Sequence, residues 1–542
     1  MLNNRLSDGF VIFTSMLVKR VFLPALLSGV LCFLAWPPLP LTPFLFVAFV
    51  PTLYITHKVT QRFHFLIALF GSLFLWNIST TWWIWNSTMI GGWLAIIANS
   101  ALMCIPWLGY RWLHNKTNRS TGYVALIAFW MAFEYLHLQD WGLSWPWLTL
   151  GNAFAARTEW VQWYAITGSS GGTLWVLLVN VLLFELWQYT SEQPRRLGQL
   201  APLLLTLVFT VSAPLFASRL LIPKVQTTMA QNVVVVQPNI DPYEKVSSGS
   251  FEQQLQQLLQ LSAAAVDSNT TLLIWPETAL YAPGGFNETE LTDNTLLRPL
   301  FAFLQQHPQL QLFTGIESYR IFNTRNSVYT RPIEGTNLYY EVYNGSVLLT
   351  ANGPTQFYHK SMLVPGVETL PRFLLFLGPV FEKFGGTTGG YARQQERTPV
   401  PLTNHFSLAP AICYESIYSE YMSRYRKAGA NLVAIITNDG WWGNTPGHKQ
   451  HLLYARLRAI ENRCWVARSA NTGISAFIDP AGNIVQQLPW WTVGTLKYNV
   501  PAYNQPSFYA RNGDWLSKLA LVLSIVSLGW LLYQQRIARR KN

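Results

Sequence analysis

The sequence predicts an α-helical membrane domain joined to a layered α/β domain. Half of the 542 residues are hydrophobic and only 12% are charged, about half the charged fraction of a typical soluble domain. Long apolar runs fill the first 219 residues and return near the C-terminus. Between them, short apolar runs alternate with amphipathic stretches, a pattern typical of strands and helices in layers.

The apolar runs predict about eight transmembrane helices. Most approach the roughly 20 residues that a helix needs to cross a bilayer. We place them at 21–38, 41–56, 63–83, 89–113, 121–139, 163–189, 198–218 and 515–533. The second run is short and bounded by prolines. Glu134 lies within the fifth run, where an ionisable group is costly. A functional role and a position near the outer interface are the two alternatives for it.

The basic residues predict the orientation in the membrane. The net charge of +12 does not indicate a nucleic-acid partner, because the basic residues cluster between apolar runs instead of forming one stripe. Eight crossings place every cluster on one side, as the positive-inside rule requires. Both termini are then expected in the cytoplasm. The clusters are Lys19/Arg20, Lys58/Arg62, Arg111/Lys116/Arg119, Arg195/Arg196 and Arg536/Arg539/Arg540/Lys541.

Three parts of the chain follow from this pattern. Residues 1–219 form the N-terminal membrane domain, 220–510 the α/β domain outside the cytoplasm, and 511–542 the last transmembrane helix with a basic tail. Within the α/β domain, strands are expected at 232–237, 271–275, 310–314, 344–349, 407–412 and 432–437, with a closing pair around 465–478. Helices are expected near 251–266, 295–306 and 446–463.

Three reactive side chains follow predicted strands: Glu277, Lys360 and Cys413. The end of a strand is where α/β enzymes place their chemistry. A buried carboxylate can take the proton of a thiol, and an ammonium group can stabilise the oxyanion that the thiolate forms with a carbonyl. A structural cysteine, a helix N-terminal carboxylate and a solvated lysine are the alternatives, because spacing alone does not bring such distant residues together.

Four cysteines allow no disulfide framework. Cys32 and Cys104 lie inside apolar runs, which leaves Cys413 and Cys464 in the α/β domain. Because a nucleophile must remain a free thiol, we expect no bridge between these two.

Five ordered motifs are similar to the nitrilase, or carbon–nitrogen hydrolase, superfamily. They are WPE at 275–277, KSMLVPGVE at 360–368, CYES at 413–416, TNDGWWG at 437–443 and a closing segment at 458–485. With seven predicted spans before the domain and one after it, the whole chain resembles the bacterial apolipoprotein N-acyltransferase family. The resemblance implies a nitrilase-like αββα sandwich for residues 220–510.

The resemblance also implies a role for each site residue. Cys413 would be the nucleophile, Glu277 the general base, and Lys360 the group that stabilises the oxyanion. Four further residues match supporting or substrate-binding positions: Glu368, Tyr414, Glu415 and Trp441. A loop carboxylate, a helix N-terminal charge and an interfacial anchor are the alternatives for these positions.

The implied reaction is an acyl transfer in two steps. Cys413 would take an acyl chain from a membrane phospholipid as a thioester, and the α-amino group of a diacylglyceryl-modified N-terminal cysteine of an apolipoprotein would then accept it. No metal or other cofactor is implied. We expect a monomer in the bacterial inner (cytoplasmic) membrane, with the catalytic domain in the periplasm. A membrane-anchored nitrilase-type amidase acting on a small amide and a non-catalytic membrane scaffold are the alternatives.

Overall fold

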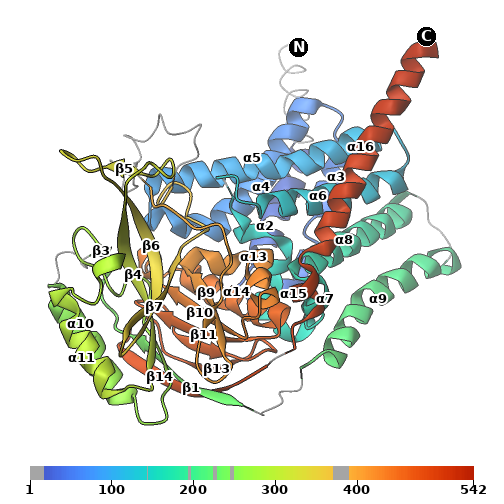
Figure 1. Cartoon of the computed structure of the whole chain (residues 1–542). Helices are drawn as coiled ribbons and strands as arrows, with labels where there is room; N and C mark the ends of the chain where they lie inside the picture. Colours follow the sequence, from blue (N-terminus) through green and yellow to red (C-terminus); the bar gives the residue numbers. More distant parts are fainter. Residues whose placement is uncertain are drawn as a thin grey trace, which may run out of the picture.

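The computed structural model describes residues 18–142, 144–192, 197–223, 229–243, 250–369, 390–503 and 505–541. The helices of the N-terminal region gather on one side of the molecule, and two β-sheets lie on the other (Figure 1). The C-terminal helix runs back along the N-terminal helices (Figure 1). The predicted basic cluster at Arg195 and Arg196 lies outside the described residues.

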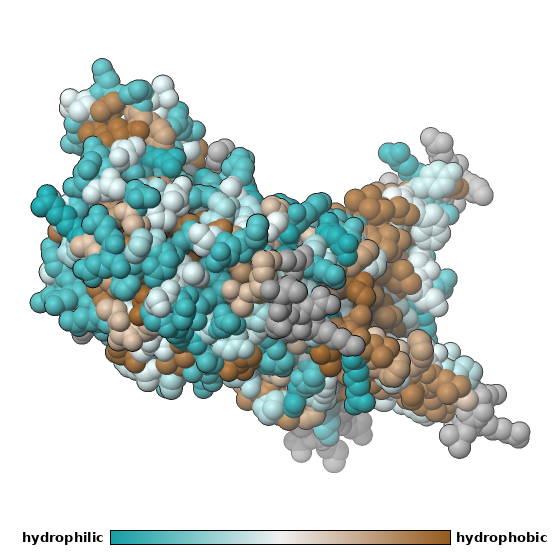
Figure 2. Space-filling view, turned by 60° about the horizontal axis from the view of Figure 1, so that its bottom comes forward, coloured by the Kyte–Doolittle hydropathy of each residue, from teal (hydrophilic) through white to brown (hydrophobic). Residues whose placement is uncertain are grey.

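The membrane region consists of helices that correspond to the predicted apolar runs. They are α2 (Leu23–Leu34), α3 (Val50–Lys58), α4 (Arg62–Thr81), α5 (Met89–His114), α6 (Arg119–His137), α8 (Ser169–Glu192), α9 (Leu197–Leu220) and α16 (Trp515–Lys541). Among the described residues, five segments are long and apolar enough to cross a membrane: 62–86, 89–114, 169–191, 200–220 and 515–537. Exposed apolar side chains cover α9 and α16, and Figure 2 shows hydrophobic surface gathered on this side of the molecule.

The predicted count of eight spans is not confirmed. The first run forms a 12-residue helix, α2, which is only about 18 Å long. The second run divides into a 3-10 turn at Thr42–Phe46 and the short helix α3. Prolines explain the interruptions, because Pro37, Pro38 and Pro40 follow α2 and a proline cannot continue a helix.

Glu134 has partners inside the membrane region. Its carboxylate accepts hydrogen bonds from the Trp130 indole (2.9 Å), the Leu150 backbone N–H (2.8 Å) and the Thr173 hydroxyl (2.6 Å). These donors come from α6, from the 3-10 segment Leu150–Ala156 and from α8. Glu134 therefore ties α6 to α8 and to the segment between them, which packs against α14 of the α/β region.

The α/β region is a sandwich of two sheets, as the resemblance implies. The first has the order β14-β1-β2-β4-β6-β5, with β3 beside β4 and β7 beside β6, and the second has the order β13-β12-β11-β10-β9-β8. Helices α10 and α11 cover the first sheet, and α13 and α14 lie beside the second (Figure 1). The helices are α10 (Phe251–Ala265), α11 (Arg298–Gln306), α13 (Ser419–Lys427) and α14 (Pro446–Asn462).

The strands agree with most of the predicted positions. They are β1 (Ala230–Gln237), β2 (Leu272–Ile274), β3 (Phe286–Asn287), β4 (Gln311–Phe322), β5 (Arg331–Pro332), β6 (Tyr339–Thr350), β7 (Gly353–His359), β8 (Val400–Pro401), β9 (Ser407–Ile412), β10 (Leu432–Thr437), β11 (Trp465–Ala470), β12 (Ala476–Ile478), β13 (Ile484–Gln487) and β14 (Gly494–Pro501). In β1, Val234 and Val236 face the core under α10, whereas Val233 and Val235 face the second sheet. Burial on both faces explains the unbroken apolar run.

Helix α14 joins the α/β region to the membrane region. Gln450 accepts a hydrogen bond from the Trp147 indole (2.7 Å), and the Tyr454 hydroxyl donates to the Trp147 carbonyl (3.0 Å). Glu461 accepts a hydrogen bond from the backbone N–H of Ser169, the first residue of α8 (3.0 Å). A carboxylate at this position is favoured by the helix dipole and satisfies a free N–H group.

Candidate active site

Cys413 directly follows β9, as predicted. Its φ of 52° lies in the left-handed region, which residues other than glycine, asparagine and aspartate rarely adopt. Such a conformation costs on the order of 1–3 kcal/mol and persists only where the surroundings hold it. A 3-10 turn at Cys413–Ile417 follows the strand, and helix α13 begins after it at Ser419.

The structure brings Glu277, Lys360 and Glu368 together in one buried group, which we call the front cluster. The Lys360 ammonium donates to Glu277 Oε1 (3.1 Å) and to Glu368 Oε1 (2.7 Å). The side-chain amide of Asn344 donates to the same two carboxylates, at 2.9 and 3.0 Å. Asn344 was not predicted as a site residue. Its polar side chain at the start of the predicted strand 344–349 was the signal that could have indicated one.

The position of Glu277 depends on a close approach by β4. A Cβ atom on Gly315 would lie 2.4 Å from the Thr278 nitrogen and 2.7 Å from the Glu277 Cα atom. Because no side chain fits there, glycine allows β4 to support the turn that follows β2. Glu277 Oε2 also accepts a hydrogen bond from the backbone N–H of Asn438 (3.2 Å).

Charges in the front cluster act on the Cys413 thiol. Burial opposes the charged form of Lys360, but Glu277 and Glu368 outweigh it, so the pKa of Lys360 lies well above its ordinary value. Burial and the Glu277 charge raise the pKa of the Cys413 thiol, and Lys360 only partly opposes them. The resting group at neutral pH is therefore the thiol, which needs a base before it can attack.

Glu415 connects two segments of the site. Its fully buried carboxylate accepts hydrogen bonds from the backbone N–H groups of Ser361 (2.6 Å), Met362 (3.1 Å) and Ile412 (2.8 Å). Two tyrosine hydroxyls donate to it as well, each at 2.7 Å. Glu415 thus joins the chain after Lys360 to the strand that carries the cysteine.

The two predicted aromatic site residues have different surroundings. Tyr414 is buried, donates a hydrogen bond to the Ser144 carbonyl (2.8 Å) and stacks on Trp145 with ring centres 6.0 Å apart. Trp441 is 41% exposed and contacts the Tyr243 ring, with centres 5.2 Å apart. Tyr414 therefore anchors the membrane region beside the cysteine, whereas Trp441 lies at the surface.

A second charged group, which the sequence did not predict, consists of Asp439, His451 and Arg468. We call it the rear cluster. Asp439 accepts from Arg468 Nη2 (2.5 Å) and from His451 Nδ1 (2.9 Å), and all three side chains are at most 1% exposed. Burial opposes the charged form of Asp439, but Arg468 and His451 outweigh it and hold the pKa of the carboxyl well below its usual range.

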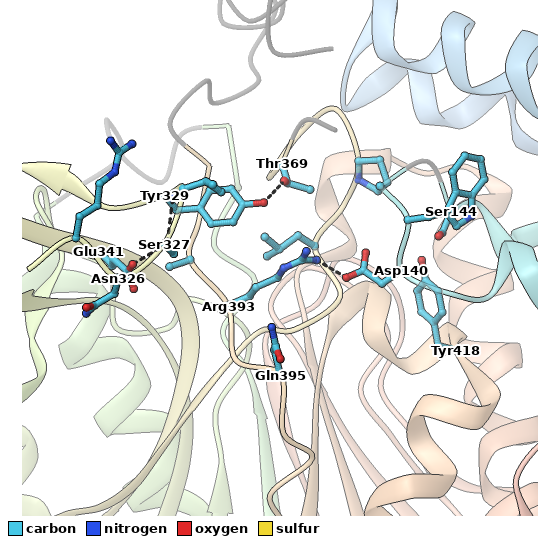
Figure 3. Close-up of a pocket in the computed structure, with 17 residues that line it drawn as sticks. Asp140, Ser144, Asn326, Ser327, Tyr329, Glu341, Thr369, Arg393, Gln395 and Tyr418 are labelled. Carbon is cyan, nitrogen blue, oxygen red and sulfur yellow. Dashed lines mark hydrogen bonds and ion pairs between the residues drawn. The ribbon is translucent and has the colours of Figure 1, made fainter. Parts of the chain in front are cut away.

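A cavity of about 850 Å³ borders the site. Its walls come from segment 140–144 of the membrane region and from the α/β segments 325–329, 363–369 and 392–395. Figure 3 shows Arg393 reaching across to Asp140, with which it forms an ion pair. Glu277, Lys360 and Cys413 are not among the lining residues, but the cavity lies against the segment that joins Lys360 to Glu368.

Comparison with known proteins gives two matches to protein families. Residues 28–182 match the apolipoprotein N-acyltransferase N-terminal domain, and residues 232–505 match the carbon–nitrogen hydrolase family. Among solved structures, an amidase from Nesterenkonia sp. aligns with 52% of this chain and 93% of its own, at 16% identity and a TM-score of 0.35.

Curated relatives match over nearly the full length. An apolipoprotein N-acyltransferase of Chlorobaculum tepidum is 30% identical over 94% of this chain and 97% of its own. One of Rickettsia prowazekii is 27% identical over 92% of this chain and 96% of its own. With five apolar helices of membrane-crossing length, these matches mark the chain as a membrane protein. The chain belongs to the apolipoprotein N-acyltransferase family.

Proposed function

We propose that this chain transfers an acyl chain from a membrane phospholipid to the α-amino group of the diacylglyceryl-cysteine at the N-terminus of a lipoprotein. Family membership supports the reaction. The observation that carries it is the buried Glu277–Lys360 pair, whose charges act on the Cys413 thiol at the end of β9.

The first step forms a thioester. Glu277 takes the proton of the Cys413 thiol, and the sulfur attacks the ester carbonyl of the phospholipid. Lys360 stabilises the oxyanion of the tetrahedral intermediate. When the intermediate collapses, the C–O bond to glycerol breaks, and Glu277 returns its proton to the leaving oxygen. The products are an acyl-cysteine and a lysophospholipid.

The second step moves the acyl chain to nitrogen. The neutral α-amino group of the acceptor attacks the thioester carbonyl, and Lys360 again stabilises the oxyanion. Glu277 accepts a proton from the attacking nitrogen, the C–S bond breaks, and the proton passes to the departing sulfur of Cys413. An α-amino group, with a pKa near 8, supplies the neutral form more readily than a lysine side chain.

The contacts of the other site residues support further roles. Glu368 accepts a second hydrogen bond from the Lys360 ammonium, so that the lysine keeps a charged partner while Glu277 changes protonation state. Glu415 fixes the chain after Lys360 relative to the cysteine. Tyr414 keeps the membrane region beside the cysteine, and the exposed ring of Trp441 offers an apolar surface to the acyl chain.

The proposal includes a location. The chain lies in the bacterial inner membrane with eight crossings, so that residues 1–219 and 511–542 form the membrane part and residues 220–510 the periplasmic catalytic domain. The basic clusters support this orientation. Thiol labelling of single cysteines introduced at Thr117 and Leu300 tests it, because labelling of both from the same side of intact cells contradicts the topology.

The alternative is an amidase that shares the same three residues. The membrane region favours the transferase, because a small soluble amide needs no lipid-facing part. The decisive experiment is mass spectrometry of the protein after incubation with phospholipid vesicles. We expect an acyl adduct on Cys413 that persists in water and discharges when a diacylated peptide with a free N-terminus is added. An N-acetylated peptide leaves the adduct intact. Rapid release of free fatty acid without a peptide supports the hydrolase instead.

A further inference from the structure

Two buried side chains contact the carbonyl oxygen of Cys413. The Ser416 hydroxyl donates to it at 2.8 Å, and Nε2 of His451 lies 3.1 Å from it. Ser416 and His451 are each 1% exposed. The strained peptide of the cysteine is therefore fixed both by its own 3-10 turn and by α14.

The contacts around this carbonyl form one network. Ser416 has one hydroxyl hydrogen, which the Cys413 carbonyl accepts. A carbonyl oxygen only accepts, so the contact with His451 is a hydrogen bond when Nε2 carries the hydrogen. Ser416 Oγ also lies 2.9 Å from Nε2, and Nδ1 lies 2.9 Å from the Asp439 carboxylate.

Asp439 and Arg468 fix the orientation of the His451 ring. Arg468 Nη2 lies 3.1 Å from Nδ1. The two attractive contacts to Asp439 are shorter, at 2.9 Å from His451 and 2.5 Å from Arg468. The groups that face the ring are Asp439, Arg468, Ser416, the Cys413 carbonyl and the indoles of Trp147 and Trp442.

We infer that His451 is a positioning residue for thioester formation: held by Asp439, it donates from Nε2 to the Cys413 carbonyl and keeps the Cys413 peptide in its left-handed conformation. This inference rests on the proposed function. A trans peptide places its C=O and N–H on opposite sides, so the same contact turns the Tyr414 N–H away from His451. If the carbonyl is released, the peptide can relax and the sulfur moves relative to Glu277. A displacement of about 1 Å is enough to slow a reaction about 100-fold.

The test compares His451→Leu, which has no donor, with His451→Gln, which keeps one. Two rates are measured on the full-length protein in detergent: acylation of Cys413 by phospholipid and its alkylation by iodoacetamide. We expect His451→Leu to lower both by about 10- to 100-fold and His451→Gln to recover part of the loss, because the amide can donate to the same carbonyl. Asp439→Asn added to His451→Leu should lower the rates no further, since both act through one contact.

Controls separate positioning from folding. Ser416→Ala removes the second donor to the same carbonyl and should lower both rates even if His451→Leu unfolds the protein. Ser469→Ala removes a buried hydroxyl that donates to the Val236 carbonyl (2.8 Å) and should leave both rates unchanged. Equal rates in His451→Leu and His451→Gln, or unchanged rates per folded molecule in both His451→Leu and Ser416→Ala, overturn the inference. If phospholipid does not acylate the wild type, the proposed function fails, while alkylation still tests His451.

Discussion

The front and rear clusters flank the same cysteine, yet their charges are arranged differently. The front cluster holds two carboxylates around one ammonium, and its members are 1–12% exposed. The rear cluster holds one carboxylate between an arginine and a histidine, at most 1% exposed. An excess of carboxylate beside the thiol suits a group that gains and loses a proton. A group that is buried from solvent, and whose carboxylate contacts both an arginine and a histidine, suits a rigid structural role. The difference suggests that one cluster performs the chemistry and the other holds the geometry.

The largest effect should follow from Glu277→Gln. The amide keeps the shape of the side chain but cannot take the thiol proton, so acylation of Cys413 should fall about 100- to 10,000-fold. Thioester formation measured by mass spectrometry checks this. Glu290→Gln, the same change at an exposed glutamate, serves as the control. Near-normal acylation in Glu277→Gln would show that Glu277 is not the general base.

Arg468→Met should act on stability more than on chemistry. It leaves the Asp439 carboxylate buried without its closest cation, which typically costs about 3–5 kcal/mol. Thermal unfolding in detergent measures the loss. Arg424→Met is the matched control, since Arg424 is half-exposed, lies 4.0 Å from Glu420 and should change stability by less than about 1 kcal/mol. Equal effects of the two substitutions would contradict a structural role for the rear cluster.

The two clusters should limit stability at opposite ends of the pH range. The lowered pKa of Asp439 gives a contribution that is present above the ordinary aspartate value of about 3.9 and is lost as pH falls. The raised pKa of Lys360 gives one that is present below about 10.4 and is lost as pH rises through the folded-state value. The unfolding midpoint should fall less steeply at acid pH in Asp439→Asn than in the wild type, and less steeply at alkaline pH in Lys360→Met. An unchanged pH dependence in both variants would contradict the assignment.

The smallest effect is expected at the rim of the cavity. Asp140 and Arg393 are about one-third exposed, so Asp140→Asn should change stability by less than about 1 kcal/mol, and high salt should shrink the difference. Unfolding at two salt concentrations measures it. An acylation loss as large as that of Glu277→Gln would instead make this ion pair part of the chemistry shown in Figure 3.

The sequence predicted the front cluster better than the rear one, for a physical reason. Glu277, Lys360 and Cys413 each follow a strand, and strand ends are where polar side chains signal a site. His451 and Arg468 lie within a buried helix and a buried strand, where periodicity records only burial. The available signal was the charge of Arg468 in WVARSA, because a buried arginine requires a partner.

The first two apolar runs show a second limit of the sequence. Hydropathy located every apolar run, but it does not record how prolines divide a run. The runs at 21–38 and 41–56 have the composition of spans, yet they contain short helices separated by turns. Backbone geometry at proline, not polarity, makes the difference.

The contacts of α14 have a consequence for the order in which the chain matures. Glu461 occupies the N-terminus of α8, although the ribosome makes it almost 300 residues after Ser169. Gln450 and Tyr454 likewise meet Trp147, which is synthesised long before them. The early helices therefore gain these protein partners only when the late part of the chain arrives. We expect truncation before α14 to leave the early helices recognisable to quality-control proteases, so that incomplete chains are removed before they accumulate.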